Sequence, residues 1–377
     1  MSLLTATSSP QASTATGAKD RTPFWDNGRW LLMVLVILGH SLDSVNGQSN
    51  AVLGAYVWIY SFHMPAFAVL SGYFSRATPP SPARMTQLVT DLLIPYFVFD
   101  TIWFFVKWAV RGDQVFDPTA PGWTLWYLLA LALFRLALPY LALLRWPLAW
   151  AVAASVIVGY LPAVDTTFSM SRAVALLPFF ALGWWVKDRA LVDRWKLLGP
   201  RPWWVPVVAV AVLATTAWAA WHFADLWREV RLTEWLYYRS AYEAMGVEQW
   251  WAGGVRLLLI GIAVVVMSAF LALVPRRAYR WTHFGQASMY IYLLHTFVLF
   301  GFREAGMLDH LEPAWIWLPS LLLAAVLIAM GLATRPIRAL FWPLVEPRPA
   351  FLFAEPSLVR RRPRPSPTSR RRSRSEK

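Results

Sequence analysis

The sequence has 377 residues, of which 58% are hydrophobic and only 15% are charged. Soluble domains are usually about 45–50% apolar and about 25% charged, so this composition is that of a membrane protein. The absence of cysteine excludes disulfides, zinc–thiolate sites and a cysteine nucleophile, and the net charge of +14 lies largely in one short C-terminal segment.

Residues 1–24 are rich in Ser, Thr, Ala and Gly and lack the apolar core of a signal peptide, which predicts a disordered cytoplasmic tail. Residues 25–335 form the predicted membrane domain, in which each apolar run approaches the roughly 20 residues that a bilayer requires. The expected fold is an all-α polytopic membrane protein with about ten transmembrane helices around a central polar cavity. The runs cover residues 29–46, 52–73, 86–110, 122–143, 146–163, 170–186, 203–222, 254–274, 283–302 and 314–333.

The first run is unusual because it carries two ionisable residues, Arg29 and His40. Eleven helical steps separate them by roughly 16 Å at about 1.5 Å per residue. Arg29 is therefore expected near one membrane face and His40 close to mid-depth, where an ionisable side chain is costly and usually functional or paired. Asp26, three residues before Arg29, is expected to cap the helix and to orient the guanidinium.

Two more histidines, His63 and His295, are predicted at about the same depth as His40, counted from the ends of the second and ninth runs. For a single buried histidine, a helix-to-helix hydrogen bond is the ordinary explanation. Three histidines in one layer favour a polar cavity instead. The remaining three fall at the predicted membrane surfaces: His222, His283 and His310.

The connection over residues 223–253 mixes charged residues with seven Trp and Tyr residues. One interpretation is an amphipathic connector in the membrane interface, where aromatic residues collect. The other is a platform for a sugar acceptor, because sugars stack on aromatic faces.

The C-terminal segment, residues 336–377, is predicted to be a basic, Pro-rich, disordered cytoplasmic tail. Its last 18 residues hold eight Arg and one Lys against one Glu. Such a tail would contact anionic membrane lipids. Nucleic acid is not an expected partner, because no nucleic-acid-binding fold accompanies the basic residues.

Lys and Arg residues in the connections set the predicted orientation. One side holds eleven of them in short connections and the other holds five, and both tails belong with the richer side. The sequence thus predicts a multi-pass protein of the cell membrane with both termini in the cytoplasm.

A base that activates a hydroxyl needs a pKa near the working pH, and histidine is the usual choice. His40 is therefore the expected general base. If the group transferred to the hydroxyl is an acyl group, its cytoplasmic donor would be acyl-CoA, which has a charged nucleotide end and a long thin arm that ends in the thioester. Arg29, with Arg76 and Arg84 in the next cytoplasmic connection, suits the phosphates, and the Arg29–His40 span is of the order of the arm's length.

The same residues resemble the acyltransferase 3 family, most closely its branch related to fucose 4-O-acetyltransferases. The Arg and His of its first helix match Arg29 and His40, and its Ser-Gly-aromatic motif matches Ser71-Gly72-Tyr73. Further matching segments are Phe62–Pro65, Leu125–Leu128 and the Leu-His pair ending at His295.

This resemblance implies a ten-helix enzyme that transfers an acyl group, commonly acetyl from acetyl-CoA, to a sugar hydroxyl of a cell-surface glycan or its lipid-linked precursor. Arg29 and His40 would be essential, and Ser71 would lie at the donor site with Arg76 and Arg84. His63, His295 and Trp126 would line the cavity. Each of three matching residues also has a purely structural explanation. Ser71 could bond to the backbone of its own helix, and Gly72 could allow close helix packing. Trp126 could be an ordinary aromatic residue of the membrane interface.

Two other classes are open. A transporter or flippase for a polar lipid or glycolipid would also need a polar cavity at mid-depth, but the sequence has no visible inverted repeat. A metalloenzyme using His40, His63 and His295 would need ligand spacing that is not found here, so no metal is expected.

Overall fold

The computed structural model of the protein describes residues 22–112, 115–192, 194, 201–308, 313–347 and 352. Every regular element in these ranges is helical, so the predicted all-α class is confirmed. The α-helices are α1 (Pro23–Leu42), α2 (Asn50–Tyr60), α3 (His63–Tyr73), α4 (Pro82–Leu88), α5 (Ile94–Arg111), α6 (Trp126–Leu141), α7 (Pro147–Ile157), α8 (Met170–Asp188), α10 (Trp204–His222), α11 (Ala224–Glu229), α12 (Leu232–Tyr237), α13 (Ala252–Leu273), α14 (Ser288–Glu304), α15 (Ala314–Leu332) and α16 (Arg335–Val345).

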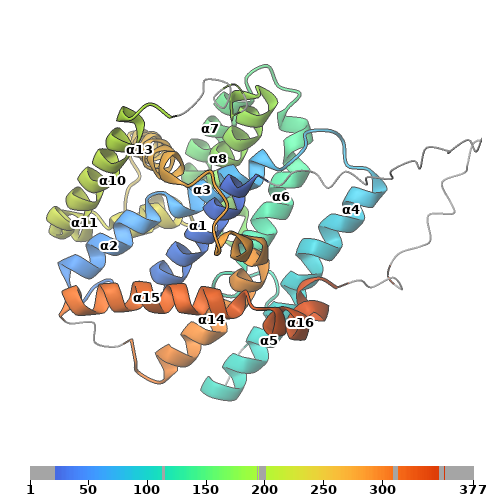
Figure 1. The fold of residues 1–377 in the computed structure, drawn as a ribbon. Helices are drawn as coiled ribbons and strands as arrows, with labels where there is room; N and C mark the ends of the chain where they lie inside the picture. The colour runs from blue at the N-terminus through green and yellow to red at the C-terminus, as the bar shows by residue number, and fades with distance from the viewer. Residues whose placement is uncertain are drawn as a thin grey trace, which may run out of the picture.

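Helix α1 lies in the middle of the molecule, in contact with α2, α3, α14 and α15 (Figure 1). Fifteen of its 20 residues are buried, which makes it the helix around which the others pack. Its first turns are fixed by Asn27, whose amide nitrogen donates to the carbonyls of Pro275 and Arg277, both at 2.9 Å. The hydroxyl of Thr282 completes this contact by donating to the Asn27 side chain at 2.7 Å.

Helices α2 and α3 form one membrane-length segment, Asn50–Tyr73, with a break at Ser61 and Phe62. Pro65 lies in the first turn of α3. Proline has no backbone N–H to continue a preceding helix, but it is tolerated in the first turn of a new one, so α3 starts as a separate helix here. His63 begins α3 and therefore lies at the break, near the middle of this segment.

Helices α3 and α8 cross at two glycines. A Cβ on Gly72 would lie 1.9 Å from the carbonyl oxygen of Phe180, and one on Gly183 would lie 2.0 Å from that of Val69. No side chain fits at either position, so the two backbones approach closely. The packing role that the sequence allowed for Gly72 is confirmed.

Six helical segments in the described ranges are long and apolar enough to cross a membrane: Asn50–Tyr73, Pro82–Arg111, Thr167–Asp188, Trp204–His222, Ala252–Leu273 and Ala314–Leu332. Only 11% of the apolar window of α10 and 17% of that of α15 are buried, so both expose apolar surface that suits lipid. Helices α6 and α7 are apolar but shorter. The count of ten spans stays a prediction.

Helix α16 lies almost entirely in the segment that the sequence analysis assigned to a disordered C-terminal tail, so the first part of that segment is helical. The helix packs against α5, α14 and α15, burying Val345 while Leu340 and Trp342 are exposed. The helix is therefore amphipathic, and packing of its buried face stabilises it although the segment is rich in proline. Residues 1–21, His310 and the tail beyond residue 347, apart from residue 352, lie outside the described residues.

Candidate active site around His40

The predicted position of His40 within its helix was wrong. Helix α1 begins at Pro23 and ends at Leu42, so it lies several residues earlier than the predicted run over 29–46. His40 is therefore in the last turn of α1 and not halfway along it. Since the C-terminal end of a helix carries partial negative charge, this position stabilises positive charge that develops on the imidazole.

One face of α1 lines a cavity of about 280 Å³, which we call the Arg29 cavity. Arg29, Met33, Val36 and His40 supply this face, at spacings of four, three and four residues that align side chains along a helix. Ser71 of α3 and Tyr127 of α6 lie in the opposite wall, with their hydroxyl oxygens 2.9 Å apart. Arg29 and His40 thus share one cavity.

Arg29 is held at the entrance of this cavity by an ion pair. Its Nη1 donates to Asp26 at 3.1 Å, and its guanidinium lies 4.5 Å from the ring centroid of Phe74. Asp26 also accepts a hydrogen bond from Gln286 at 3.3 Å. The predicted orienting role of Asp26 agrees with this geometry, whereas the predicted capping role is wrong, because the N-cap residue is Thr22.

A second opening adjoins the Arg29 cavity and contains more cations. It has a volume of about 490 Å³ and shares Phe74 and Arg135 with the Arg29 cavity, and we call it the Arg76 pocket. Arg76 and Arg84, for which the sequence analysis predicted a cationic mouth, both line this pocket. Arg84 donates to both oxygens of Thr78, which fixes its side chain across the pocket. Sequence reasoning missed Arg135, although it lies within the predicted fourth run.

The imidazole of His40 is surrounded by polar and aromatic groups. Its Nδ1 is 3.3 Å from the hydroxyl of Tyr60, and its ring centroid is 5.7 Å from that of His295 and 5.9 Å from that of Trp123. Arg303 donates to the His40 carbonyl at 3.4 Å. Tyr60 was not a sequence-predicted site residue.

His63 and His295 each bond to the backbone of the preceding turn. In each, Nδ1 lies within hydrogen-bond distance of the carbonyl four residues earlier, at 2.9 Å from Ile59 and 3.0 Å from Ile291. Since a carbonyl only accepts, Nδ1 carries the proton and Nε2 of the neutral ring is left as an acceptor. Nε2 of His295 is buried with no hydrogen-bond partner in the described part of the chain.

A third cavity of about 330 Å³ continues from His40 on the side away from Arg29, and we call it the Asp43 cavity. His40, Met64 and Trp126 line both this cavity and the Arg29 cavity. The predicted cavity residues His63 and Trp126 both border the Asp43 cavity, whereas His295 lies behind His40 and is fully buried. His40 therefore lies where the two cavities meet.

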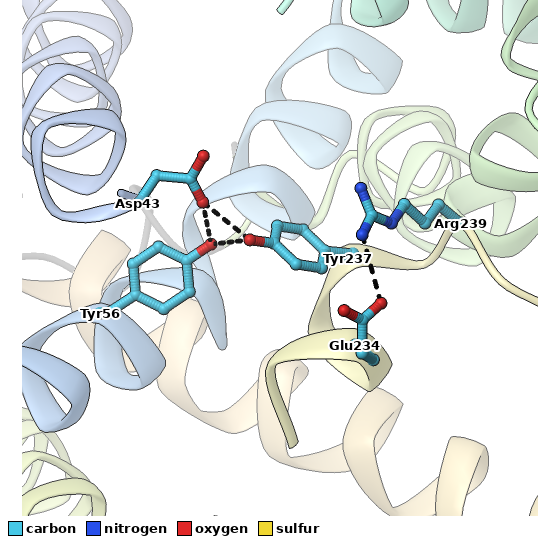
Figure 2. A network of polar contacts seen from close by, with 5 residues as sticks. All are labelled: Asp43, Tyr56, Glu234, Tyr237 and Arg239. Carbon is cyan, nitrogen blue, oxygen red and sulfur yellow. Dashed lines mark hydrogen bonds and ion pairs between the residues drawn. The ribbon is translucent and has the colours of Figure 1, made fainter. Parts of the chain in front are cut away.

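Figure 2 shows the polar network at the wall of the Asp43 cavity. The hydroxyl oxygens of Tyr56 and Tyr237 lie 2.8 and 2.7 Å from Oδ1 of Asp43, and 2.6 Å from each other. Burial, together with the nearby Asp43 carboxylate, raises the pKa of the Tyr237 hydroxyl, which keeps it protonated. This network ties the last residue of α12 and a residue of α2 to Asp43, the C-cap of α1.

The connection over residues 223–253 divides into two parts. Tyr237, Tyr238 and Arg239 line the Asp43 cavity, whereas Trp235 and Tyr242 pack in a separate apolar cluster. Trp250 is exposed. Part of the connection therefore forms a cavity wall, and the rest has the packed and exposed aromatic residues of an amphipathic connector.

Three or more His, Asp or Glu side chains arranged to hold a metal ion do not occur among the described residues. The described residues thus form an all-helical fold with several apolar, membrane-length helices, and two cavities in it share His40.

The sequence matches the acyltransferase domain of the acyltransferase 3 family over residues 22–334. The protein belongs to this family.

Two curated relatives carry the name nodulation protein NolL. The protein from Sinorhizobium fredii (strain NBRC 101917 / NGR234) is 28% identical over 190 residues, which cover 46% of this chain and 50% of that protein. The one from Mesorhizobium japonicum (strain LMG 29417 / CECT 9101 / MAFF 303099) is 26% identical over 231 residues, which cover 56% of this chain and 59% of that protein. The chain thus spans about half the length of the curated relatives it matches. No solved structure matches the chain.

Proposed function

We propose that the protein transfers an acyl group, acetyl in the simplest case, from cytoplasmic acetyl-CoA to a sugar hydroxyl of a cell-surface glycan or its lipid-linked precursor. The observation that carries this proposal is the meeting of two cavities at His40, one reaching Arg29 and the other reaching Asp43. Such an arrangement lets donor and acceptor reach one imidazole from opposite directions.

On the donor side, the Arg76 pocket would bind the nucleotide end of CoA. Arg76, Arg84 and Arg135 supply guanidinium groups that suit phosphate oxygens, and Arg29 lies further in. From Arg29 the thin pantetheine arm would follow the α1 face for the roughly 16 Å that separate it from His40. The Ser71 and Tyr127 hydroxyls would offer polar contacts to the amides of that arm.

At His40, the chemistry would be general-base catalysis. In the tautomer that this requires, Nδ1–H donates to the Tyr60 hydroxyl and Nε2 takes the proton of the acceptor hydroxyl. The acceptor oxygen forms a bond to the thioester carbonyl carbon, and the carbon–sulfur bond breaks. The CoA thiolate then takes the proton back from His40, so the enzyme ends the cycle unchanged.

The acceptor would enter through the Asp43 cavity. Trp126 and Tyr237 offer aromatic faces to a sugar ring, and Arg239 offers donors to its hydroxyls. His63 borders the same cavity with Nε2 as an acceptor. This assignment places the Arg29 side in the cytoplasm and the Asp43 side outside, with both termini cytoplasmic and ten spans in the cell membrane.

The test uses the purified protein in liposomes with acetyl-labelled acetyl-CoA and extracted cell-envelope glycans. We expect the label in carbohydrate, and we expect His40→Ala to lower the transfer rate by about 10²- to 10⁴-fold, the usual contribution of a general base. His222→Ala is the matched control, because His222 stacks on Trp218 away from both cavities. A transporter or flippase would leave the label on CoA, and that result would refute the proposal.

A further inference from the structure

We propose that the acceptor carries an oxyanion, a carboxylate or a phosphate, and that the Asp43 cavity binds this group at Arg172 and the N-terminus of α8. This inference rests on the proposed function, because it specifies the acceptor of that reaction. It concerns a group next to the reacting hydroxyl, not the hydroxyl itself.

Arg172, in the first turn of α8, is the starting observation. Its guanidinium lies 4.7 Å from the ring centroid of Trp126 and lines the Asp43 cavity. Its Nε is buried without a hydrogen-bond partner, and no carboxylate pairs with it in the described part of the chain. A buried charge without a counter-charge is costly, so a ligand that supplies one is stabilised there.

The acidic groups nearby are engaged elsewhere. Among the described residues that line the cavity, Asp43 is the sole carboxylate, and its Oδ1 lies against the Tyr56 and Tyr237 hydroxyls (Figure 2). Arg239, a second guanidinium on the cavity, contacts Glu234 at 3.4 Å. The charge of Arg239 is thus balanced by Glu234, whereas the charge of Arg172 has no carboxylate partner in the described part of the chain.

Two further unpartnered groups border the same cavity. Ser169 immediately precedes α8, is 1% exposed, and has a buried hydroxyl with no hydrogen-bond partner within the described ranges. The Tyr238 hydroxyl is also buried and unpartnered in that part of the chain. Together with the partial positive charge at the start of the 19-residue α8, these donors form a site for a negatively charged oxygen group.

A neutral sugar satisfies this site less well. It would fill the cavity but leave the Arg172 charge without a counter-charge. A guanidinium binds carboxylates and phosphates with paired N–H donors, so both a sugar acid and a sugar phosphate fit. The two differ in charge and shape, which allows them to be distinguished by experiment.

The experiment measures sugar binding to the full chain in nanodiscs saturated with CoA, so that the Arg29 side is occupied. Saturation-transfer NMR titrations would compare glucose, glucuronate and glucose 1-phosphate. We expect at least one charged probe to bind about tenfold or more tightly than glucose, as expected for a charge-assisted hydrogen bond. The tighter of the two charged probes identifies the oxyanion.

Arg172→Gln should abolish the preference for the charged probe, and Arg172→Lys should keep part of it. Arg145→Gln is the matched control, because Arg145 is exposed and lies over Trp146 as Arg172 lies over Trp126. Equal binding of charged and neutral probes, or a preference that survives in Arg172→Gln, would overturn the inference. His40→Gln should lose acyl transfer but keep the preference, which separates failure of the proposed function from failure of this inference.

Discussion

Tyr60→Phe removes one oxygen atom from the site and tests how His40 works. The Tyr60 hydroxyl lies 3.3 Å from Nδ1 of His40, and in the proposed mechanism it accepts the Nδ1–H bond that keeps Nε2 free. The aromatic packing is preserved by Phe, since the Tyr60 ring stacks on Tyr56 at 4.0 Å and meets His63 edge-on at 4.7 Å. The substitution therefore leaves the ring packing in place and removes only the polar contacts of the hydroxyl, to His40 and to Tyr56.

The size of the effect follows from the charge on the ring. A hydrogen bond to a charged group contributes about 1.5–3 kcal/mol, and the imidazole becomes charged in the transition state. The distance of 3.3 Å is long for this type of bond, so we take the lower end, about 1.5 kcal/mol, which is roughly a tenfold loss in kcat. KM for acetyl-CoA should stay unchanged, because Tyr60 does not line the Arg29 cavity.

The assay is steady-state transfer of labelled acetyl, with kcat and KM measured separately. Tyr140→Phe serves as the control, since Tyr140 is 71% exposed on α6. In a His40→Ala background, Tyr60→Phe should have no further effect, because the two residues act as a unit. An unchanged kcat in Tyr60→Phe, or losses that simply add in the double variant, would refute the assigned role.

Two other substitutions test the donor side and the fold. Arg29→Gln should raise KM for acetyl-CoA about tenfold, with Arg29→Lys in between, because a charge-assisted phosphate contact is lost; an unchanged KM in the titration of acetyl-CoA would exclude that contact. Gly72→Ala should lower the thermal unfolding temperature, because its Cβ would lie 1.9 Å from the Phe180 carbonyl, whereas Gly261→Ala, with open space around it, should not. Equal melting temperatures for the two alanine variants would contradict the close crossing of α3 and α8.

The sequence alone identified ionisable residues that are unfavourable within their own apolar segment. Arg29 and His40 stand out because each interrupts an apolar run, and their spacing places them on one helical face. Arg135 also interrupts an apolar run, the predicted fourth one, but was not predicted as a site residue. Arg172 lies at the edge of a run, where a cation is ordinarily explained by the membrane boundary.

Contacts between distant segments could not be predicted from the sequence. Asp43 and Tyr237 are 194 residues apart, and no periodicity relates them. The position of His40 was also misjudged, because hydrophobicity alone does not mark the end of α1 at Leu42. Helix ends depend on local capping and on tertiary contacts such as those of Asn27, which lie outside any hydropathy pattern.

The most direct test is a structure of the protein with a non-hydrolysable acetyl-CoA analogue. The account predicts the CoA phosphates in contact with Arg29 as well as Arg76, Arg84 and Arg135, the pantetheine arm along the Arg29 cavity, and the carbonyl carbon roughly 3–4 Å from the space that an acceptor oxygen bound to Nε2 of His40 would occupy. A nucleotide bound on the Asp43 side, or an acyl group that does not reach His40, would contradict it.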